Sequence, residues 1–471
     1  MEIHIPVFKI IAVLGVLASI AASIKFLFFS EHAKESVLRL EKLKNLPKAL
    51  LERNPLSSYL GWEMDLDAGI YFPDSVRSRH VHIIGATGSG KTESVLLNLI
   101  DQDALRAFPL VILDAKGDRS FVDFLKSHPR AKDRLFVFDP MSPKDSVKYN
   151  PLETGSKTEA AMRLFNSMSW SEEFYKIRAR EMLMRVVDQF DKKKIDLSLS
   201  GLKRVFESST SLGSFIGNED NPVKVSESQY EQLSGLVAQI NQLCHGPLGE
   251  VIGGENGAQK SLNMREAIQS SRVLYFRLPA LVDPETTAVV GKLLIAELAQ
   301  YAAEVHAGGL KPVFTPVFLD EFGSLACAAF LELIAKARSA GLALHFSHQS
   351  MGDLVAAGEA FINQVTDNSS TKIVLRVYDP DTADLVARTF GNKNTLKSTK
   401  QMVTDVMGSL KETGVMAVRD TKEFRADPDK IKSLPTGCAF VLMSHALKPI
   451  ESASDVFRLR FPLPPKYTVN Q

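Results

Sequence analysis

The sequence predicts an α/β fold with a mainly parallel sheet, and three observations support this. Several short apolar runs have the length of buried strands. They cover residues 80–84, 108–113, 134–139, 272–278, 317–320 and 342–347. Helix-compatible stretches separate several of these runs, which is the alternation typical of a parallel sheet. The first run leads directly into a glycine-rich loop, and a helical stretch follows that loop.

The glycine-rich loop fits the phosphate-binding pattern G-x-x-x-x-G-K-[ST]. It consists of Gly85, Ala86, Thr87, Gly88, Ser89, Gly90, Lys91 and Thr92. In a strand–loop–helix context, successive backbone N–H groups and the positive end of the helix converge on phosphates. Lys91 adds a positive charge, and Thr92 offers a hydroxyl to Mg²⁺. The loop therefore predicts a site for ATP and Mg²⁺, and the structural alternative is a glycine-rich turn with a chance lysine.

A nucleotide loop needs further residues that hold Mg²⁺ and activate water, and two predicted strand ends compete for this role. One strand ends in Asp114; the other ends in Asp320 and is followed at once by Glu321. We favour the second, because Asp320 can hold the metal while Glu321 accepts a proton from the attacking water. The structural alternative for this acidic pair is an exposed turn. Asp114 comes one strand after the glycine loop and stays a candidate for facing the phosphates.

The strand predicted at residues 342–347 is followed by His348 and Gln349. If this strand lies beside the Asp320 strand, Gln349 is placed to sense the γ-phosphate. We interpret His345 and His348 as packed or hydrogen-bonded side chains. The sequence contains no His, Cys and Asp cluster with the spacing of a metal site, and no Ser-His-Asp set.

Length and composition limit the class of protein only loosely. A chain of 471 residues suggests two or three domains, and 45% hydrophobic residues allow a large core. The formal net charge of +1 does not exclude DNA, because a ring-shaped motor can hide its basic surface in a channel. The three cysteines, Cys244, Cys327 and Cys438, are too widely spaced for a metal pair or a disulfide framework. This usage is typical of a reducing compartment.

The amino-terminal segment predicts a membrane anchor. Residues 10–24 carry no charge, and the stretch from Pro6 to Phe29 is long enough for one membrane-spanning helix. Lysines and arginines are frequent after residues 10–24, whereas Lys9 is the only one before them. The positive-inside bias predicts a single-pass protein with the bulk of the chain in the cytoplasm. A cleaved signal peptide is the alternative, but the segment lacks a basic leading region.

Changes in pattern along the chain predict five segments. Residues 1–30 form a transmembrane anchor and 31–60 a linker. Residues 61–155 form the first part of a nucleotide-binding domain, 156–268 an inserted all-α domain, and 269–471 the second part. The insert is predicted from helical periodicity, and its polar stretch at 213–225 is expected to be a loop. Beyond Gly391 the signals weaken, apart from a strand-like run at 437–443.

Further short motifs extend the pattern over most of the chain. They are Asp114-Ala-Lys-Gly-Asp118, Asp139-Pro140, Tyr149-Asn-Pro-Leu152, Phe318-Leu-Asp-Glu-Phe322, Ala337-Arg-Ser-Ala-Gly341, His348-Gln349 and Thr371-Lys-Ile-Val-Leu-Arg376. The glycine loop alone is common to many families. The ordered set, with a membrane anchor ahead of it and a helical insert between the two acidic strands, resembles the type IV secretion coupling proteins. These are the TraD/TraG-type ATPases of bacterial conjugation.

The resemblance implies more than the residues alone predict. It implies a RecA-like P-loop NTPase core, a homo-hexamer around a central channel, and a place in the bacterial inner membrane. It also implies that ATP hydrolysis drives single-stranded DNA, or a relaxase–DNA complex, toward the components of a type IV secretion channel. The sequence departs from the family in its membrane segment, because family members usually have two membrane helices and the sequence predicts one.

A ring ATPase needs a positive charge from the neighbouring subunit to stabilise the transition state. We expect Arg376 to supply it, with Arg338 as the second choice; the alternative for each is an ordinary surface arginine. Two other functions stay open as alternatives to the pumping of single-stranded DNA. One is an adaptor for protein cargo with a slow, switch-like ATPase, and the other is a double-stranded DNA translocase of the FtsK/HerA type.

Overall fold

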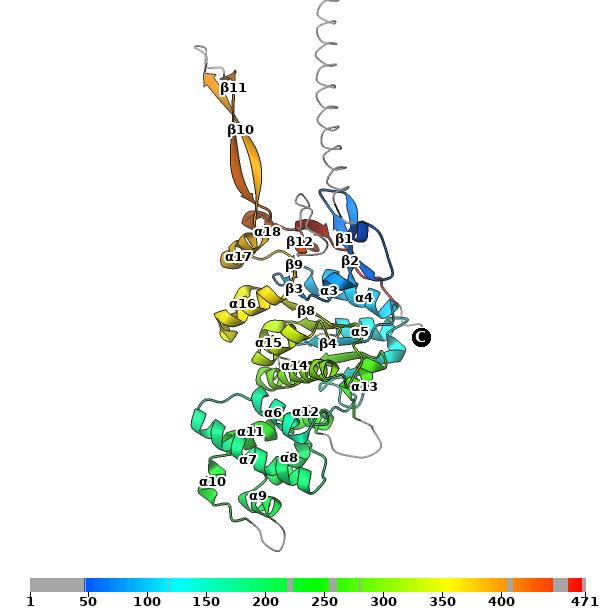
Figure 1. Ribbon diagram of the computed structural model, residues 1–471, viewed down its shortest axis with the longest axis vertical. Coiled ribbons are helices and arrows are strands. Elements are labelled where there is room, and N and C mark those ends of the chain that lie inside the picture. Colours follow the sequence, from blue (N-terminus) through cyan, green and yellow to red (C-terminus); the bar gives the residue numbers. More distant parts are fainter. Residues whose placement is uncertain are drawn as a thin grey trace, which may run out of the picture.

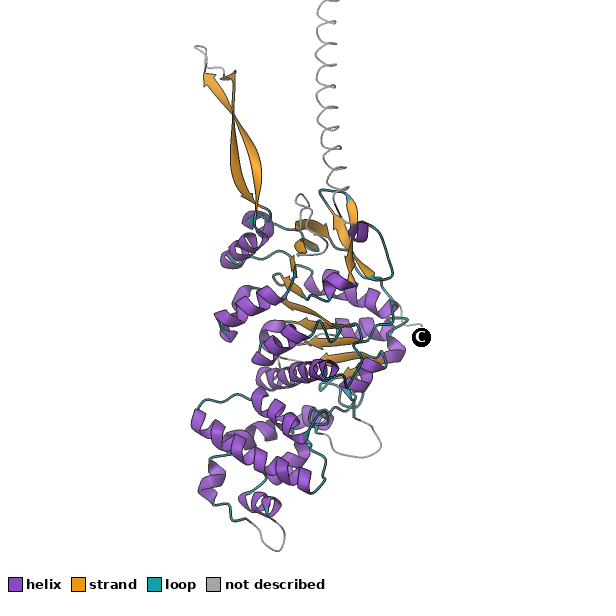
Figure 2. Ribbon diagram, in the orientation of Figure 1, coloured by secondary structure: helices purple, strands orange, loops and turns teal. Residues whose placement is uncertain are grey.

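The computed structural model describes residues 46, 48–117, 119–217, 223–253, 261–278, 280, 282–404, 410–443 and 456–467. In this part of the chain eleven strands form one sheet, in the order β2-β1-β13-β12-β9-β3-β8-β7-β4-β6-β5 (Figure 1). Helices pack on the sheet, and a helical block lies at one end of it (Figure 2). The prediction of an α/β fold with a mostly parallel sheet is confirmed.

The centre of the sheet is parallel. Its strands, from one side to the other, are β9 (Thr371–Val374), β3 (Val81–Ile84), β8 (Leu342–His348), β7 (Thr315–Asp320), β4 (Leu110–Asp114), β6 (Val273–Arg277) and β5 (Leu135–Phe138). Because parallel strands share a direction, the carboxyl ends of β3, β7 and β8 come together at one edge of the sheet. The glycine loop, the acidic pair and Gln349 each follow one of these ends.

The other side of the sheet is antiparallel. Here β12 (Cys438–Met443) pairs with β9, and β13 (Val456–Arg460) pairs with both β12 and β1 (Ser57–Glu63). Strand β2 (Ala68–Pro73) forms the edge beside β1. The sequence did not predict these two edge strands, or the short helix α3 (Asp74–Arg77) that follows them.

Both faces of the sheet are covered, as the continuous apolar runs require. Strand β7 shows how the two faces divide: Val317 and Leu319 belong to one apolar cluster, and Phe318 belongs to the other. The first face is covered chiefly by α14 (Pro284–His306) and α15 (Ala328–Lys336), and the second by η1 (Lys91–Leu96), α4 (Leu97–Leu105) and α5 (Ser120–Ser127).

A block of helices interrupts the sheet between β5 and β6. Its helices are α6 (Lys157–Ser167), α7 (Glu173–Lys192), α8 (Leu199–Val205), α9 (Ser209–Ile216), α10 (Glu227–Glu231), α11 (Ser234–Leu243), α12 (Gly246–Ile252) and α13 (Met264–Gln269). In Figure 1 most of this block lies below the sheet. The sequence predicts a loop at 213–225, but helix α9 continues to Ile216. The helix is stabilised by the burial of Leu212 and by the Ser208 side chain, which accepts a backbone N–H at its start.

The later part of the chain alternates between short helices and strands. Two 3₁₀ turns, η3 (Phe322–Leu325) and η4 (Met351–Ala357), follow β7 and β8; α16 (Glu359–Asn368), α17 (Pro380–Phe390) and α18 (Pro428–Lys432) come later. Between α17 and α18 runs an antiparallel hairpin of β10 (Asn392–Thr404) and β11 (Leu410–Phe424), which projects from the body in Figure 1. Lys393, Lys397 and Lys400, which follow Gly391 in the sequence, lie on β10.

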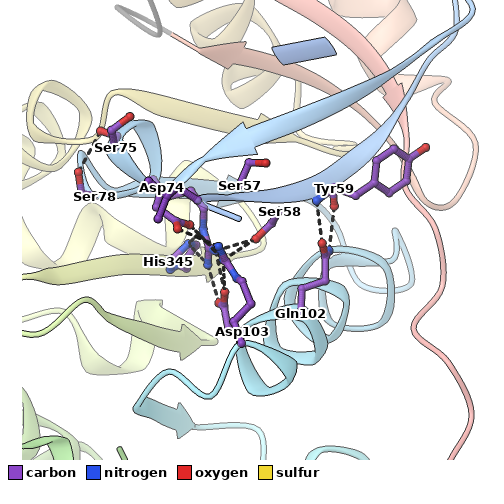
Figure 3. A network of polar contacts seen from close by, with 12 residues as sticks. Ser57, Ser58, Tyr59, Asp74, Ser75, Ser78, Gln102, Asp103 and His345 are labelled. Carbon is purple, nitrogen blue, oxygen red and sulfur yellow. Dashed lines mark hydrogen bonds and ion pairs between the residues drawn. The ribbon is translucent and has the colours of Figure 1, made fainter. Parts of the chain in front are cut away.

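The edge strands are tied to the centre by a buried polar network (Figure 3). Arg77 of α3 makes two parallel hydrogen bonds to Asp103 of α4, at 2.8 and 2.6 Å. The same guanidinium donates to the Ser58 hydroxyl of β1 at 2.9 Å and lies 3.3 Å from His345 Nε2 of β8. The Arg106 guanidinium also donates hydrogen bonds to the carboxylates of Asp74 and Asp103. The network therefore joins β1, α3, α4 and β8 in one cluster.

The predicted membrane helix, residues 10–24 with its flanks, lies outside the described residues. Among the residues that the structure describes, no helix is long and apolar enough to cross a bilayer.

Candidate functional site

The glycine loop leaves the end of β3 and enters η1, a π-helical turn that continues into α4. Its backbone depends on glycine, since Gly88 and Gly90 have φ angles of +75° and +102°. On the neighbouring side, Gly85 N–H donates to the His348 carbonyl at 3.2 Å and Ala86 N–H donates to the Arg376 carbonyl at 2.8 Å. The loop is thus held between the ends of β8 and β9.

The Lys91 side chain folds back toward the first residues of the loop. Its ammonium donates to the Gly85 carbonyl at 2.6 Å and is 3.5 Å from the Ala86 carbonyl. Burial lowers the pKa of this ammonium, while the carboxylates of Glu321 and Asp320 act in the opposite direction. A buried ammonium bonded only to neutral carbonyls would gain from an anion, so the loop fits a phosphate group.

The acidic pair at the end of β7 lies beside the loop. The Thr92 hydroxyl donates to Asp320 Oδ2 at 3.0 Å, and the Ser347 hydroxyl of β8 donates to Asp320 Oδ1 at 2.5 Å. Asp320 is almost completely buried. A buried carboxylate and a hydroxyl in contact, next to a phosphate loop, are the oxygen ligands that Mg²⁺ uses at such sites. The residues present therefore fit a magnesium ion.

Glu321 differs from Asp320 in exposure and backbone. It has a left-handed backbone with φ +52° and ψ +47°, which turns the chain sharply out of the strand. Burial, followed by the neighbouring charge of Asp320, raises the pKa of Glu321. A carboxylate with a raised pKa is a better proton acceptor, which is the property that a general base requires.

Asp114, the competing acid, is bonded within its own part of the sheet. Its Oδ1 accepts the backbone N–H groups of Lys116 and Gly117, each at 3.0 Å. Its Oδ2 accepts the Tyr275 hydroxyl at 2.8 Å. Its strand β4 lies beside β7, with Asp114 in register with Asp320. These three bonds give Asp114 a structural task in the β4 turn.

Gln349 follows β8, which pairs with β7 as the sequence reading required. Its side chain connects two parts of the site: Oε1 accepts the Thr87 hydroxyl at 3.0 Å, and Nε2 donates to Glu321 Oε2 at 3.3 Å. Neighbouring His348 is buried and 2.6 Å from His82, Nε2 to Nε2. Burial lowers the pKa of His348 to about 4, so both the bond and the charge agree with a packed residue.

Arg376 lies just beyond β9, on the side of the loop away from the acidic pair. Its guanidinium donates to the Leu434 carbonyl at 3.4 Å and lies 5.4 Å from the centre of the Tyr378 ring. The segment that follows Leu434 also touches the loop, since Gly437 N–H donates to the Ser89 carbonyl at 2.9 Å. Arg376 therefore stands beside the loop of its own subunit.

Sequence reasoning missed three groups that touch the site: Ser347 on Asp320, Asp353 behind Gln349, and Gly437 behind the loop. Ser347 carried a weak signal, because it ends the run that leads to Gln349. Asp353 stands three residues after Ser350, the spacing of a capping box, and Gly437 opens the strand-like run at 437–443. Neither pattern indicates contact with the site, since these partners are defined by the path of the chain in space.

Two family models match the chain. Residues 66–234 match the type IV secretion-system coupling protein DNA-binding domain. Residues 315–435 match the model described as the TraM recognition site of TraD and TraG. The chain belongs to the type IV secretion coupling protein family. The resemblance predicted from the sequence motifs is thereby confirmed. The three strands of the candidate site, β3, β7 and β8, lie inside the matched parts of this coupling protein.

Solved structures share the fold of this coupling protein. The unbound monoclinic form of the bacterial conjugative coupling protein TrwBdeltaN70 has a TM-score of 0.67 and 16% identity, over 90% of this chain and 91% of that chain. The plasmid coupling protein TrwB in complex with ADP and Mg²⁺ has a TM-score of 0.64 and 16% identity, over 90% and 93%.

A more distant structure has the same core. VirB4 of Thermoanaerobacter pseudethanolicus has a TM-score of 0.55 and 12% identity, over 88% of this chain and 98% of that chain. No curated protein sequence matches the chain.

Proposed function

We propose that this coupling protein is an ATPase that moves single-stranded DNA, with its attached relaxase, toward a type IV secretion channel. ATP and Mg²⁺ bind at the loop of residues 85–92. The family assignment supports the coupling role, and the matched DNA-binding model supports contact with DNA. A related structure, of TrwB, contains ADP and Mg²⁺, which supports the choice of nucleotide and metal.

One observation carries the enzymatic part of the proposal. The phosphate loop and the acidic pair are separated by more than 220 residues in the sequence, yet the Thr92 hydroxyl donates to Asp320 Oδ2 at 3.0 Å. Gln349 then links the loop to Glu321 through its two amide atoms. Lysine, hydroxyl, two carboxylates and an amide around one loop are the set that phosphoanhydride hydrolysis requires.

Each residue has a defined task in the proposed reaction. Lys91 neutralises charge on the γ-phosphate, and Thr92 and Asp320 hold Mg²⁺. The metal, when bound, offsets the charge of the phosphate oxygens and orients them. Glu321 accepts the proton of the attacking water. Gln349 bonds both the loop and Glu321, so a phosphate bound in the loop can change the position of the Glu321 carboxylate through Gln349.

The oligomeric part of the proposal concerns Arg376. We place the protein in a homo-hexamer in which Arg376 stabilises charge in the transition state of a neighbouring site. Arg376 is also beside the loop of its own subunit. Arg376→Ala with unchanged ATP affinity and reduced turnover supports a catalytic role. Mixing this variant with Lys91→Ala then shows whether Arg376 acts on its own site or on that of a neighbouring subunit. Mixed rings regain activity only if an intact Arg376 in one subunit can act on an intact Lys91 site in its neighbour.

The proposed organisation follows the predicted segments. Residues 1–30 anchor the protein as a single-pass protein in the bacterial inner membrane, and 31–60 link the anchor to the cytoplasmic part. Residues 61–155 and 269–471 form the nucleotide-binding domain, and 156–268 form the all-α insert. Fusing reporters to residue 31 and to the carboxyl terminus and testing their accessibility in cells measures this topology.

The central experiment is an ATPase assay of the full-length chain with single-stranded DNA, double-stranded DNA and no DNA. We expect single-stranded DNA to stimulate turnover most. Lys91→Ala should abolish both ATPase activity and conjugative transfer. Glu321→Gln should retain ATP binding and lower kcat by about 10²- to 10³-fold, since the amide cannot accept the proton.

Other outcomes identify other functions. Transfer at the wild-type level with Lys91→Ala would refute the motor. ATPase activity that no DNA stimulates would favour the adaptor for protein cargo. Stronger stimulation by duplex would favour a double-stranded DNA translocase.

A further inference from the structure

Asp353 lies in η4, directly behind the residue proposed as sensor. Its Oδ2 accepts the backbone N–H of Gln349 at 2.7 Å and that of Ser350 at 3.0 Å. In return, the Ser350 side chain accepts the backbone N–H of Asp353, which also donates to the Ser350 carbonyl at 3.1 Å. This reciprocal arrangement is a capping box at the start of η4. The backbone that carries the Gln349 side chain is therefore oriented by a single carboxylate.

Asp353 also contacts the turn that follows Glu321. A Cβ placed on Gly323 would lie 2.8 Å from the Asp353 Cβ and 3.4 Å from its carbonyl oxygen. Side chains do not approach this closely, so only glycine permits η3 and η4 to pack as they do. The loop of the proposed base and the loop of the proposed sensor thus meet at Asp353.

The side chain of Gln349 completes this connection. It accepts the Thr87 hydroxyl and donates to Glu321 Oε2. Rotating or shifting the Gln349 backbone would break both bonds, because an amide reaches two partners only from one position. The Glu321 carboxylate is thus linked to the phosphate loop through Gln349, whose backbone N–H is bonded to Asp353.

We propose that Asp353 is a positioning residue, which holds Gln349 and the Glu321 turn in one geometry so that the phosphate sensor and the base act as a unit. The inference rests on the proposed ATPase function. Asp353 touches neither the phosphate loop nor the Thr92–Asp320 pair in the bonds described for it. Its effect is therefore expected on the reaction rather than on nucleotide binding.

The alternative is that Asp353 only stabilises η4, as other capping boxes stabilise their helices. The kcat of an alanine variant separates the two ideas, since a cap alone leaves the kcat of the folded protein unchanged. Asparagine tests whether the accepted N–H groups carry the effect, because its Oδ1 can still accept them while alanine cannot. The Asp353 side chain is 35% exposed, so water can replace the lost bonds and the variants should fold. Glu159 provides a matched control, since it closes the same motif with Ser156 at the start of α6.

The test compares ATP turnover by the full-length chain in four forms: wild type, Asp353→Ala, Asp353→Asn and Glu159→Ala. We expect Asp353→Ala to lower kcat about tenfold with KM for ATP unchanged, because misplacing catalytic groups acts on the transition state. Asp353→Asn should recover most of the lost kcat. Glu159→Ala should have wild-type kcat and KM, although its thermal midpoint falls.

Gly323→Ala tests the same inference from the other side, since its methyl group pushes against Asp353. It should lower kcat without raising KM, even if Asp353→Ala is too unstable to assay. Wild-type kcat in both Asp353→Ala and Gly323→Ala overturns the inference, as does a change in KM alone. Equal losses in Asp353→Ala and Asp353→Asn also overturn it. Absence of ATPase activity in the wild type instead overturns the proposed function.

Discussion

At the residue scale, His80 shows how the start of β3 is joined to the neighbouring strand β8. It precedes β3, has a φ angle of +69°, and is almost completely buried. Its Nδ1 accepts the backbone N–H of Leu344 at 3.2 Å, which requires that nitrogen to be unprotonated. Burial lowers the pKa of His80 to about 4. The ring is therefore neutral in the folded protein at physiological pH.

This depressed pKa makes stability depend on pH. Between pH 6.5 and 4 the unfolded chain binds a proton at His80 that the folded chain does not, so stability falls as the pH falls. The shift corresponds to a loss of about 3 kcal/mol. His80→Asn keeps an acceptor for Leu344 and tolerates a positive φ. We expect urea unfolding of this variant to show a shallower pH dependence below pH 6.5; an identical dependence would contradict the assignment.

At the element scale, the buried ion pair between α3 and α4 decides how the antiparallel edge is attached. Arg77 and Asp103 both have fully buried side chains and form a two-pronged contact. Desolvating such a pair is costly, so the pair adds less to stability than its geometry suggests. Removing one partner is a different matter, because the other charge is then left buried. The pair therefore specifies where α3 and β1 lie on the sheet.

Asp103→Ala should consequently lower the free energy of unfolding by about 3–5 kcal/mol. Asp191→Ala is the control: it removes an exposed pair with Lys157, at 3.1 Å, and should cost less than about 1 kcal/mol. Denaturant unfolding monitored by circular dichroism measures both. Similar losses in the two variants would show that burial of Arg77 does not carry the effect.

At the scale of the whole molecule, the helical insert and the sheet share one apolar core. The same cluster of buried side chains contains Leu183 and Leu236 of the insert and Val317 and Leu344 of the sheet. A backbone bond reinforces the joint, where the N–H of Tyr149, just ahead of the insert, donates to the Val251 carbonyl of α12 at 2.8 Å. Sequence periodicity separates the insert from the sheet, whereas the packing joins them.

Two tryptophans allow this joint to be tested. Trp62 lies on β1 and Trp170 lies between α6 and α7, and the chain has no others. The Trp62→Phe variant keeps Trp170 as a fluorescent probe of the insert. The Trp170→Phe variant keeps Trp62 as a probe of the sheet edge. We expect both probes to report the same urea midpoint, because a shared core unfolds cooperatively. Clearly separated midpoints would show that the insert unfolds independently.

Much of the fold and the centre of the site could be predicted from local patterns. The strand, loop and helix around Lys91 are adjacent in the chain, and Asp320 with Glu321 end a continuous apolar run. Strand order could be anticipated only in part: Gln349 was expected beside the Asp320 strand, and β8 does pair with β7. The antiparallel edge was missed, because β1 and β2 contain turn-forming and polar residues that weaken the alternating pattern.

The sequence by itself determined the phosphate loop, the acidic pair and the alternation of strands and helices, because each depends on neighbours a few residues apart. Only the tertiary structure decided that Thr92 meets Asp320, that Arg77 is buried against Asp103, and that Asp353 supports Gln349 and the Glu321 turn. These contacts join segments whose separation in the chain says nothing about their distance in space. They exist because the parallel strands bring their carboxyl ends to one edge of the sheet.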